Sequence, residues 1–176
     1  MNNSLKKSYT QLYYGTGKGK TTAAIGLAVR AAGCNFKVFI AQFIKGLVYS
    51  EIKCLEKLSD NITLKQYGRV CFIKKEPTQK DIEAAKKGLK EVKDIIMSGK
   101  YDLVVLDEIG VSEYFGLLTT GEILDLINSK PSNVELVLTG RKASQALIDA
   151  ADLVTEMREI KHYYNQGVIA RKGIEK

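Results

Sequence analysis

Cysteine, histidine, proline and tryptophan are all scarce in this sequence. Three cysteines, one histidine, two prolines and no tryptophan occur among its 176 residues. Cys34, Cys54 and Cys71 lie far apart, without a CxxC pair or the Cys/His spacing of zinc ligands. We therefore expect reduced thiols rather than a disulfide framework or a structural zinc site. A chain of this length can bury enough apolar surface to fold without either.

Long apolar segments are missing as well. No run approaches the roughly 18 to 20 apolar residues that cross a bilayer, and the polar residues 1–8 contain no apolar centre of a signal peptide. These absences predict a cytoplasmic protein without a membrane partner. No repeat or linker divides the chain, so residues 1–176 are expected to form one domain. Residues 1–8 are expected either to be disordered or to lie over the functional site.

Acidic residues are outnumbered by basic ones, but the excess is unevenly placed. The chain has 27 Lys and Arg against 20 Asp and Glu, a formal net charge of +7. Residues 1–20 carry four lysines and no acid, whereas residues 101–158 carry four basic and ten acidic side chains. Such a balance favours a polyanionic partner without the even basic coat expected over a nucleic-acid-binding surface.

Predicted strands alternate with predicted helices along the chain. Strands are expected at Tyr9–Tyr14, Lys37–Ile44, Ile62–Tyr67, Leu103–Leu106, Val134–Thr139 and Leu153–Met157, the last three as buried parallel strands. Helices are expected at Lys20–Gly33, Val48–Leu58, from Thr78 or Gln79 to Met97, near Thr120–Asn128 and at Ser144–Ala151, with an exposed loop over 69–77. This order predicts an α/β fold with a mostly parallel sheet and helices on both faces.

The strongest local signal is a glycine-rich segment between the first strand and the first helix. In such a loop, backbone N–H groups surround phosphate oxygens, the helix N-terminus favours anions, a lysine adds a mobile cation and a hydroxyl faces Mg²⁺. The pattern G-x-x-x-x-G-K-[ST] is met except at its first glycine, where Tyr14 stands. We predict a triphosphate-binding loop made of Gly15, Thr16, Gly17, Lys18, Gly19, Lys20, Thr21 and Thr22.

A second signal is the apolar strand Leu103–Leu106, which ends in Asp107 and Glu108. In proteins with a phosphate-binding loop, a carboxylate at this place holds Mg²⁺ opposite the hydroxyl of the loop. Ligands of parallel α/β sheets bind at the carboxyl ends of the strands. The loop and the carboxylates are therefore expected at the same edge of the sheet.

These two motifs predict a nucleoside triphosphate and magnesium without naming the reaction. A GTPase is disfavoured because no N-K-x-D segment is present. A RecA-like ATPase stimulated by nucleic acid remains an alternative, with Glu108 activating water and Arg141 or Arg158 as an arginine finger. A small-molecule kinase is a third candidate.

Five segments, two of which contain the motifs above, carry a family resemblance. GTGKGKTTAAIGLAVRAAG followed by VFIAQFIKG, then DLVVLDEIG, ELVLTGRKASQALIDAADLVTEM and IKHYYNQGVIARKGIE, resemble the ATP:corrinoid adenosyltransferases of the cobalamin pathway in content and order. The resemblance covers most of the chain and is weakest over 47–101. It implies a RecA-like P-loop fold, usually as a homodimer.

The resemblance also implies the reaction. Members of this family transfer the 5′-deoxyadenosyl group of ATP to the cobalt of a reduced Co(I) corrinoid and release triphosphate, in adenosylcobalamin biosynthesis or salvage. It implies Mg²⁺, with Mn²⁺ as a substitute, and a flavodoxin-like or other flavin reductant. Because the corrinoid supplies the nucleophile, the protein orients the reactants and neutralises the leaving triphosphate. His162 then needs no acid–base role.

Several site residues follow from the resemblance. Residues 15–22 are expected to bind the triphosphate, and Lys20, Thr21 and Glu108 to act in catalysis. Thr21 and Glu108 are expected to ligate the metal, with Asp107 behind them.

Three assignments outside these motifs are looser. Arg30 matches a family arginine near the ribose or base, or is an ordinary surface charge, and Lys45 is expected to contact the nucleotide or the corrinoid. The family uses a Phe and a Trp to displace the lower axial ligand of the corrinoid. Phe72 matches the Phe, or is a plain loop residue, while Ile73 or Lys74 stands near the place of the Trp.

Overall fold

Six parallel strands form one sheet through the part of the molecule that the structure describes. The computed structural model describes residues 5–46, 50–58, 60–68 and 76–175. The strand order is β3-β2-β4-β5-β1-β6, and every paired neighbour is parallel. The strands are β1 (Thr10–Tyr14), β2 (Val38–Phe43), β3 (Ile62–Tyr67), β4 (Leu103–Asp107), β5 (Glu135–Gly140) and β6 (Leu153–Glu156).

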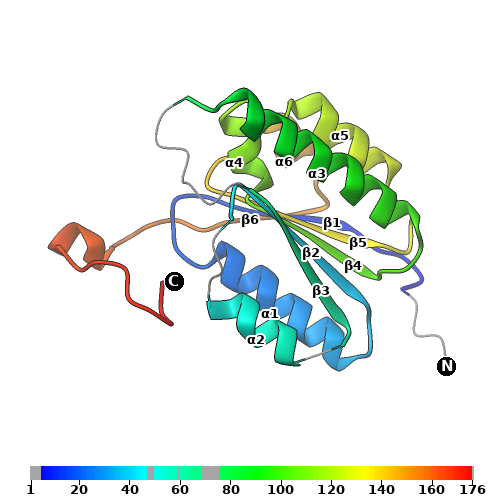
Figure 1. The fold of residues 1–176 in the computed structure, drawn as a ribbon, viewed down its shortest axis with the longest axis horizontal. Helices are drawn as coiled ribbons and strands as arrows, with labels where there is room; N and C mark the ends of the chain where they lie inside the picture. The colour runs from blue at the N-terminus through cyan, green and yellow to red at the C-terminus, as the bar shows by residue number, and fades with distance from the viewer. Residues whose placement is uncertain (1–4, 47–49, 59, 69–75, 176) are drawn as a thin grey trace.

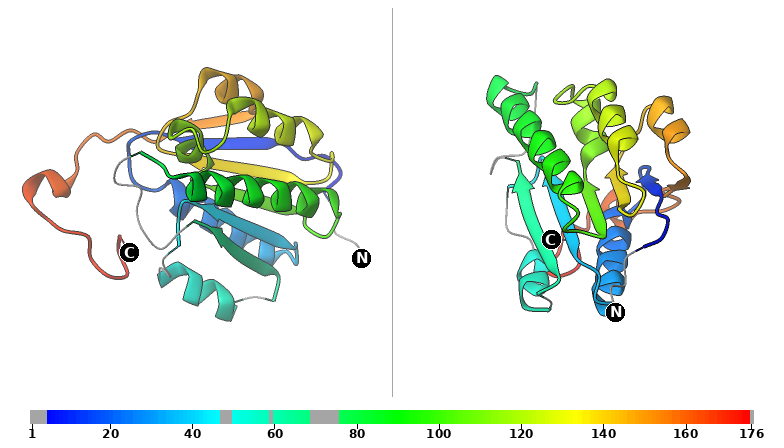
Figure 2. Two further views of the ribbon diagram at one scale, coloured as in Figure 1. Left: turned by 45° about the horizontal axis from the view of Figure 1, so that its top comes forward. Right: turned by 90° about the vertical axis from the view of Figure 1, so that its right-hand side faces the viewer.

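Helices cover both faces of the sheet, as the alternating pattern predicts. On one face lie α1 (Lys20–Gly33) and α2 (Ser50–Leu58) (Figure 1). On the other lie α3 (Gln79–Met97), α4 (Ile109–Tyr114), α5 (Thr120–Ser129) and α6 (Gln145–Ala150), and the two layers separate clearly in Figure 2. The short helix α4 was not predicted. A 3₁₀ turn, η1 (Tyr163–Gln166), lies in the C-terminal tail.

The central strand β4 divides the core between the two helical layers. Val104 and Leu106 belong to the cluster beneath α3 to α6, while Leu103 and Val105 belong to the cluster beneath α1 and α2. This alternation follows from the period of two in a strand, and both faces are apolar because both are covered. The α1 side of the core includes Ala24, Ala28 and Ala31, whose small side chains allow that helix to lie close to the sheet.

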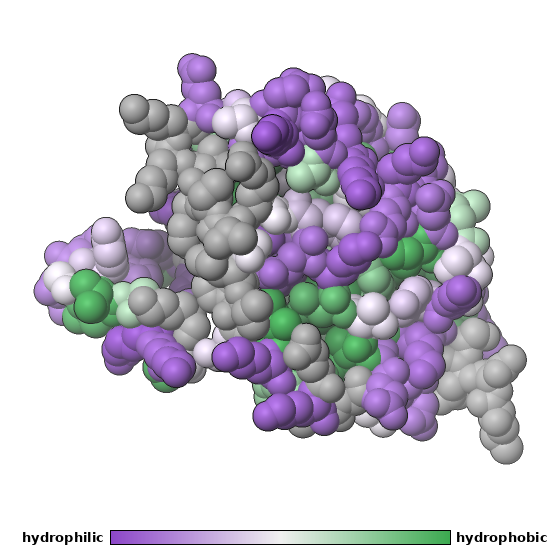
Figure 3. Space-filling model, viewed as in Figure 1, coloured by the Kyte–Doolittle hydropathy of each residue, from purple (hydrophilic) through white to green (hydrophobic). Residues whose placement is uncertain are grey.

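The helix α3 is amphipathic, as its sequence spacing predicts. Leu89, Val92 and Ile96 are buried beneath it, whereas its outer surface is hydrophilic (Figure 3). Its first turn is closed by a capping box, in which the hydroxyl and the amide of Thr78 contact the Asp81 carboxylate. Among the described helices, none is long and apolar enough to cross a membrane.

The last strand differs from its prediction. Leu153–Met157 was expected to be a buried strand, but β6 is an edge strand beyond β1 and all its residues are exposed. The prediction of burial is therefore wrong. An apolar run indicates a strand, whereas its burial depends on where the strand enters the sheet. Among the strands that the structure describes, β6 pairs with β1 alone.

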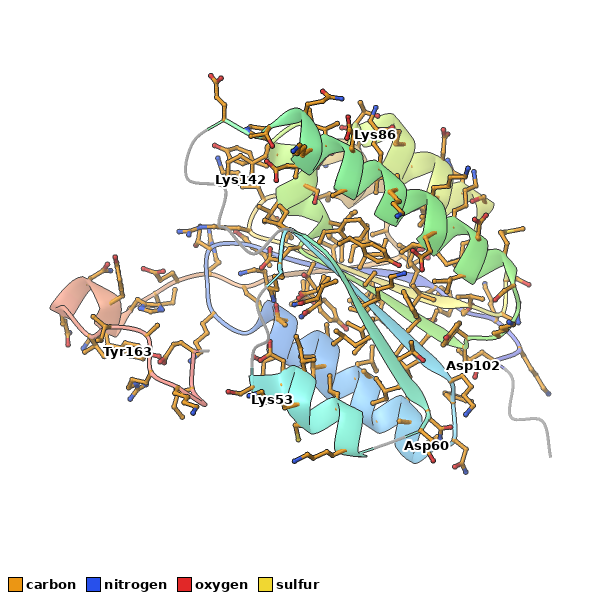
Figure 4. The ribbon with its side chains drawn as sticks, viewed as in Figure 1. Lys53, Asp60, Lys86, Asp102, Lys142 and Tyr163 are labelled. Carbon is orange, nitrogen blue, oxygen red and sulfur yellow. The ribbon has the colours of Figure 1, made fainter. Side chains whose placement is uncertain are left out.

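The N-terminal segment runs to the far end of the sheet from the glycine-rich loop. Ser8 is buried, and its amide and hydroxyl both donate to the carbonyl of Ser132, at 2.9 and 2.7 Å. Ser8 is thus ordered and does not lie over the loop, while residues 1–4 are outside the described part. In Figure 4, Asp102 and Lys142 mark the two opposite ends of the sheet.

Cys34 and Cys54 are free and exposed, and Cys71 lies outside the described residues. Neither described cysteine takes part in the core.

Two helical glycines give opposite predictions for stability. A Cβ on Gly88 of α3 would lie 2.6 Å from Cγ of Tyr67, whereas a Cβ on Gly26 of α1 would meet nothing within 4 Å. We expect Gly88→Ala to lower the free energy of unfolding by about 1–3 kcal/mol through overpacking. Gly26→Ala should raise it by about 0.5–1 kcal/mol because alanine favours helix. Urea denaturation measures both, and changes of the same sign would contradict this packing.

Candidate functional site

The glycine-rich loop joins β1 to α1 at the carboxyl end of the sheet. Gly15 and Gly19 have φ of 115° and 119°, values that favour glycine. A Cβ on Gly17 would lie 2.8 Å from the carbonyl oxygen of Met157, and one on Gly15 would overlap the same group. The Gly17 amide donates to that oxygen at 2.7 Å. The chain that crosses the loop therefore requires glycine at these positions, independently of phosphate binding.

The helix α1 begins at Lys20 and directs its N-terminus into this end of the sheet. The Lys20 ammonium lies over the loop and donates to the carbonyl of Gly17 at 2.7 Å. Partial burial lowers the pKa of Lys20, although the nearby charge of Glu108 opposes the shift. A helix N-terminus beside a lysine is a favourable place for a phosphate group.

Asp107 is the centre of a buried hydrogen-bond network. Its carboxylate is 1% exposed and accepts from Thr21 Oγ1 at 2.8 Å and from Thr139 Oγ1 at 2.7 Å. It also accepts from Lys45 Nζ at 2.7 Å and from Gln42 Nε2 at 3.2 Å. Burial alone would lower the pKa of Lys45, but the charge and hydrogen bond of Asp107 raise it overall. The start of α1, directly after the glycine-rich loop, and the end of β4 are thus joined directly.

Glu108 differs from Asp107 in its backbone conformation and in its hydrogen bonds. Its backbone is left-handed, with φ of 63°, and it caps the start of α4. Its Oε2 atom is buried and has no hydrogen-bond partner among the described residues. Burial, followed by the charge of Asp107, raises the pKa of the Glu108 carboxyl. An unpartnered buried carboxylate oxygen at this place suits a cation that arrives with a ligand.

Two pockets meet at Lys20 and Glu108. The larger, with a volume of about 680 Å³, lies beside the start of α1 and α2 and is lined by Thr21 and Lys45 among others. The smaller, of about 500 Å³, extends towards Arg141 and the tail. The residues that line both pockets are Lys18, Lys20, Glu108 and His162. The basic and acidic groups at the loop therefore face two adjacent pockets.

The side chains at the loop fit magnesium better than a metal held by protein ligands alone. No cluster of three or more His, Cys, Asp or Glu side chains suited to a metal occurs in the described residues. Magnesium needs only one or two protein ligands when phosphate and water supply the others. The hydroxyl of Thr21 and the unpartnered oxygen of Glu108 provide that number at the edge of the larger pocket.

The C-terminal tail crosses the loop and then extends away from the sheet, with η1 at its outer end (Figure 1). Lys18 turns towards this tail, and its ammonium lies 3.1 Å from a carboxylate oxygen of Glu175 and 3.3 Å from the hydroxyl of Tyr163. Tyr163 is labelled in Figure 4. Arg171, then Tyr163, lowers the pKa of Glu175 well below its usual range. Lys18 lines both pockets while its ammonium contacts the tail, so its predicted binding of triphosphate stays a prediction.

Some of the remaining predicted residues line the pockets and others do not. Thr22 lines the larger pocket and Thr16 the smaller one. Arg30 is exposed near the end of α1, ten residues from Lys20 or about 15 Å along the helix, and lines neither pocket. Phe72 lies outside the described residues, so its assignment stays a prediction.

Two residues of the network were missed in the sequence. Gln42 and Thr139 are fully buried polar residues within apolar strands, and both donate to Asp107. A polar residue near the end of a buried strand is a signal that could have found them, since buried polar groups require partners.

Comparison with known proteins agrees with this geometry. Residues 6–175 match the family described as ATP:corrinoid adenosyltransferase BtuR/CobO/CobP. This chain belongs to that family. It is 33% identical over 165 residues to a corrinoid adenosyltransferase of Pseudomonas aeruginosa, covering 93% of this chain and 81% of the relative. It is 32% identical to the corrinoid adenosyltransferases of Escherichia coli and Salmonella typhimurium, with 93% of this chain and 83% of each relative covered.

Family membership confirms the resemblance seen in the sequence and separates the candidate reactions. The family is one of adenosyl transfer to corrinoids. The alternative of a nucleic-acid-stimulated ATPase receives no support from these relatives.

The two adjacent carboxylates predict opposite effects on stability. Asp107→Ala should lower the free energy of unfolding by about 3–5 kcal/mol, because it leaves the Lys45 ammonium largely buried without its carboxylate partner. Glu108→Gln should leave it equal or higher at pH 7, because the buried carboxylate gains no hydrogen bond at Oε2. Urea denaturation without ligands measures both.

The pH dependence of the Glu108→Gln comparison follows from the raised pKa. A raised folded pKa means that the wild type is stabilised by protonation of Glu108, and that this contribution is lost as pH rises. The advantage of Glu108→Gln should therefore shrink as the pH falls from 7 towards 5. A large loss of stability in this variant at pH 7 would contradict the description of Glu108.

Proposed function

We propose that this protein transfers the 5′-deoxyadenosyl group of ATP to the cobalt of a reduced Co(I) corrinoid and releases triphosphate. The observation that carries the proposal is the family match over residues 6–175, together with a pocket whose polar groups suit a triphosphate. The reaction serves adenosylcobalamin biosynthesis or salvage.

The proposed chemistry asks for no protein nucleophile. The cobalt of the corrinoid substrate supplies the electron pair for the new Co–C5′ bond, and the C5′–O bond breaks with its pair leaving on triphosphate. The protein holds the two substrates in line and stabilises the charge that develops on the leaving group. The proposal is supported by Lys20, the N-terminus of α1 and the loop backbone, which line the same pocket.

We assign Mg²⁺, or Mn²⁺ in its place, to Thr21 and Glu108. When bound, the metal would neutralise phosphate charge. The hydroxyl of Thr21 donates to Asp107 and accepts from Lys45 Nζ at 3.4 Å, which leaves one lone pair of its oxygen for the cation. Glu108 brings an unpartnered carboxylate oxygen. Lys45 lines the same pocket and is proposed to contact the nucleotide or corrinoid.

The family resemblance extends the proposal to the setting of the reaction. We propose a cytoplasmic homodimer that receives electrons for the cobalt from a flavodoxin-like or other flavin reductant. Size-exclusion chromatography with light scattering measures the oligomeric state. Reduction of bound Co(II) corrinoid by a flavodoxin-like or other flavin protein tests the source of electrons.

The assignment of the reaction has a direct test. The protein mixed with ATP, Mg²⁺ and chemically reduced cob(I)alamin should yield the light-sensitive adenosyl product and an equal amount of inorganic triphosphate. Release of phosphate with ADP, or of diphosphate, would overturn the proposed reaction.

Lys20→Ala should reduce turnover about 100-fold, because it removes a preorganised cation from the leaving triphosphate. Folding should be preserved, since Lys20 bonds only to the carbonyl of Gly17 among the described contacts. Lys86→Ala is the matched control, because Lys86 is an exposed lysine of α3 that pairs with Glu122 (Figure 4). Adenosyl product formation and circular dichroism measure the two effects. An unfolded Lys20→Ala protein, or equal activity in both variants, would contradict this role.

Phe72→Ala should slow the reaction when cobalt must be reduced from Co(II) in the site, because the family Phe acts on the lower axial ligand. The same variant should react normally with cobalamin that is already reduced to Co(I). Parallel assays from the two oxidation states make the comparison. Equal losses in both would show that Phe72 has a different role.

A further inference from the structure

Thr139 occupies the junction between the two carboxylates of the site. It is fully buried near the end of β5, where Leu138 is paired with Leu106 of β4, so Thr139 lies beside Asp107. Its hydroxyl donates to Asp107 Oδ1 at 2.7 Å and accepts from the Glu108 amide at 2.9 Å. One oxygen atom therefore links the hydrogen-bonded carboxylate to the backbone of the unpartnered one.

The backbone of Glu108 needs such support. Its left-handed conformation, with φ of 63°, costs a residue with a side chain about 1–2 kcal/mol. This conformation ends β4, starts α4 and leaves the Glu108 side chain at the edge of both pockets. The bond from its amide to Thr139 is a contact that holds the turn against β5.

The backbones around this bond are also tightly fitted. A Cβ on Gly140 would lie 2.7 Å from the Cα atom of Gly110, so the end of β5 and the start of α4 touch directly. The DEIG and TGR segments of the sequence meet here. This close fit fixes both partners of the Thr139 hydroxyl, the Asp107 carboxylate and the Glu108 amide.

We propose that Thr139 is a positioning residue that aims the Glu108 carboxylate at the metal of the bound nucleotide. The inference rests on the proposed assignment of Mg²⁺ to Thr21 and Glu108. Thr139 acts by fixing the Glu108 amide, and Asp107 holds the hydroxyl of Thr139 in the orientation that leaves its oxygen free to accept. A side chain of the same shape without the hydroxyl cannot replace Thr139, because the hydroxyl both donates to Asp107 and accepts from the Glu108 amide at one oxygen atom.

The test measures binding of ATP in the absence of corrinoid, by titration calorimetry with Mg²⁺ and with EDTA. The ratio of the two affinities reports how well the protein uses the metal. Thr139→Val keeps the shape and removes both hydrogen bonds, and it should lower this ratio about ten-fold, in the range for residues that orient metal ligands. Thr139→Ser keeps the hydroxyl and should retain the ratio of the wild type.

Thr10→Val is the matched control for loss of a buried threonine. Thr10 is 2% exposed and lies on β1 opposite Leu136, at the far end of β5 from Thr139. This variant should keep the ratio even where its melting temperature falls. If Thr139→Val fails to fold, Thr139→Ala serves the same comparison without a second methyl group in the tight space.

The background of Glu108→Gln separates action through Glu108 from general damage. There, Thr139→Val should cause no further loss in the ratio, because the oriented carboxylate is already gone. An additional ten-fold loss in that background would overturn the proposal. So would a Thr139→Val protein with the ratio of the wild type. A wild-type protein whose affinity for ATP ignores Mg²⁺ would overturn the metal assignment itself and this inference with it.

Discussion

The buried carboxylate of Asp107 is the interaction on which the site depends. A charge at 1% exposure is costly unless its oxygens are satisfied, and here α1, β2 and β5 each supply a donor, as does Lys45 just after β2. Those donors come from segments far apart in the sequence. The same bonds that make the charge tolerable therefore fix the start of α1 and the ends of three adjacent strands relative to one another. The glycine-rich loop is therefore positioned by the core of the protein as well as by its own sequence.

Two adjacent carboxylates with contrasting surroundings give this site its chemical character. Asp107 has a full set of partners, whereas Glu108 has a buried oxygen without one and a raised pKa caused by burial and by the adjacent charge. The left-handed turn between β4 and α4 produces this contrast, because it separates the directions of two consecutive side chains. Under the proposed assignment of Mg²⁺, a bound cation would give this oxygen a partner. Part of the stability that is sacrificed at Glu108 would then reappear as affinity for the metal-bound nucleotide.

Local pattern was enough to predict most of the fold and the two principal motifs. The period of α3, the apolar run of β4 and the GKT segment each depend on neighbouring residues, and all three lie where predicted. The failures depend on distant contacts. Burial of β6 is decided by its place beyond β1, and α4 has too few residues to show a helical period. The pairing of Thr139 with Asp107 depends on strand order, which places β5 beside β4. Two residues that are 32 positions apart in the sequence therefore lie side by side. Exposure of Arg30 away from the pocket likewise reflects the length of α1, because a residue ten positions along a helix is carried away from its N-terminus.

The tail changes the meaning of the glycine-rich loop and of the basic charge near the N-terminus. Gly15 and Gly17 lie against the backbone of Met157 and Arg158, so a side chain at either position would collide with the tail before any phosphate arrived. The contact with the tail alone therefore explains glycine at these two positions. Lys18 is similarly engaged, since it pairs with Glu175. Of the two loop lysines, Lys20 alone lies over the loop backbone beside Glu108, with a pKa lowered chiefly by burial. A desolvated cation interacts more strongly with an incoming anion than a solvated one. The net charge of +7 is therefore a poor guide to binding, because the burial of one lysine matters more than the number of lysines.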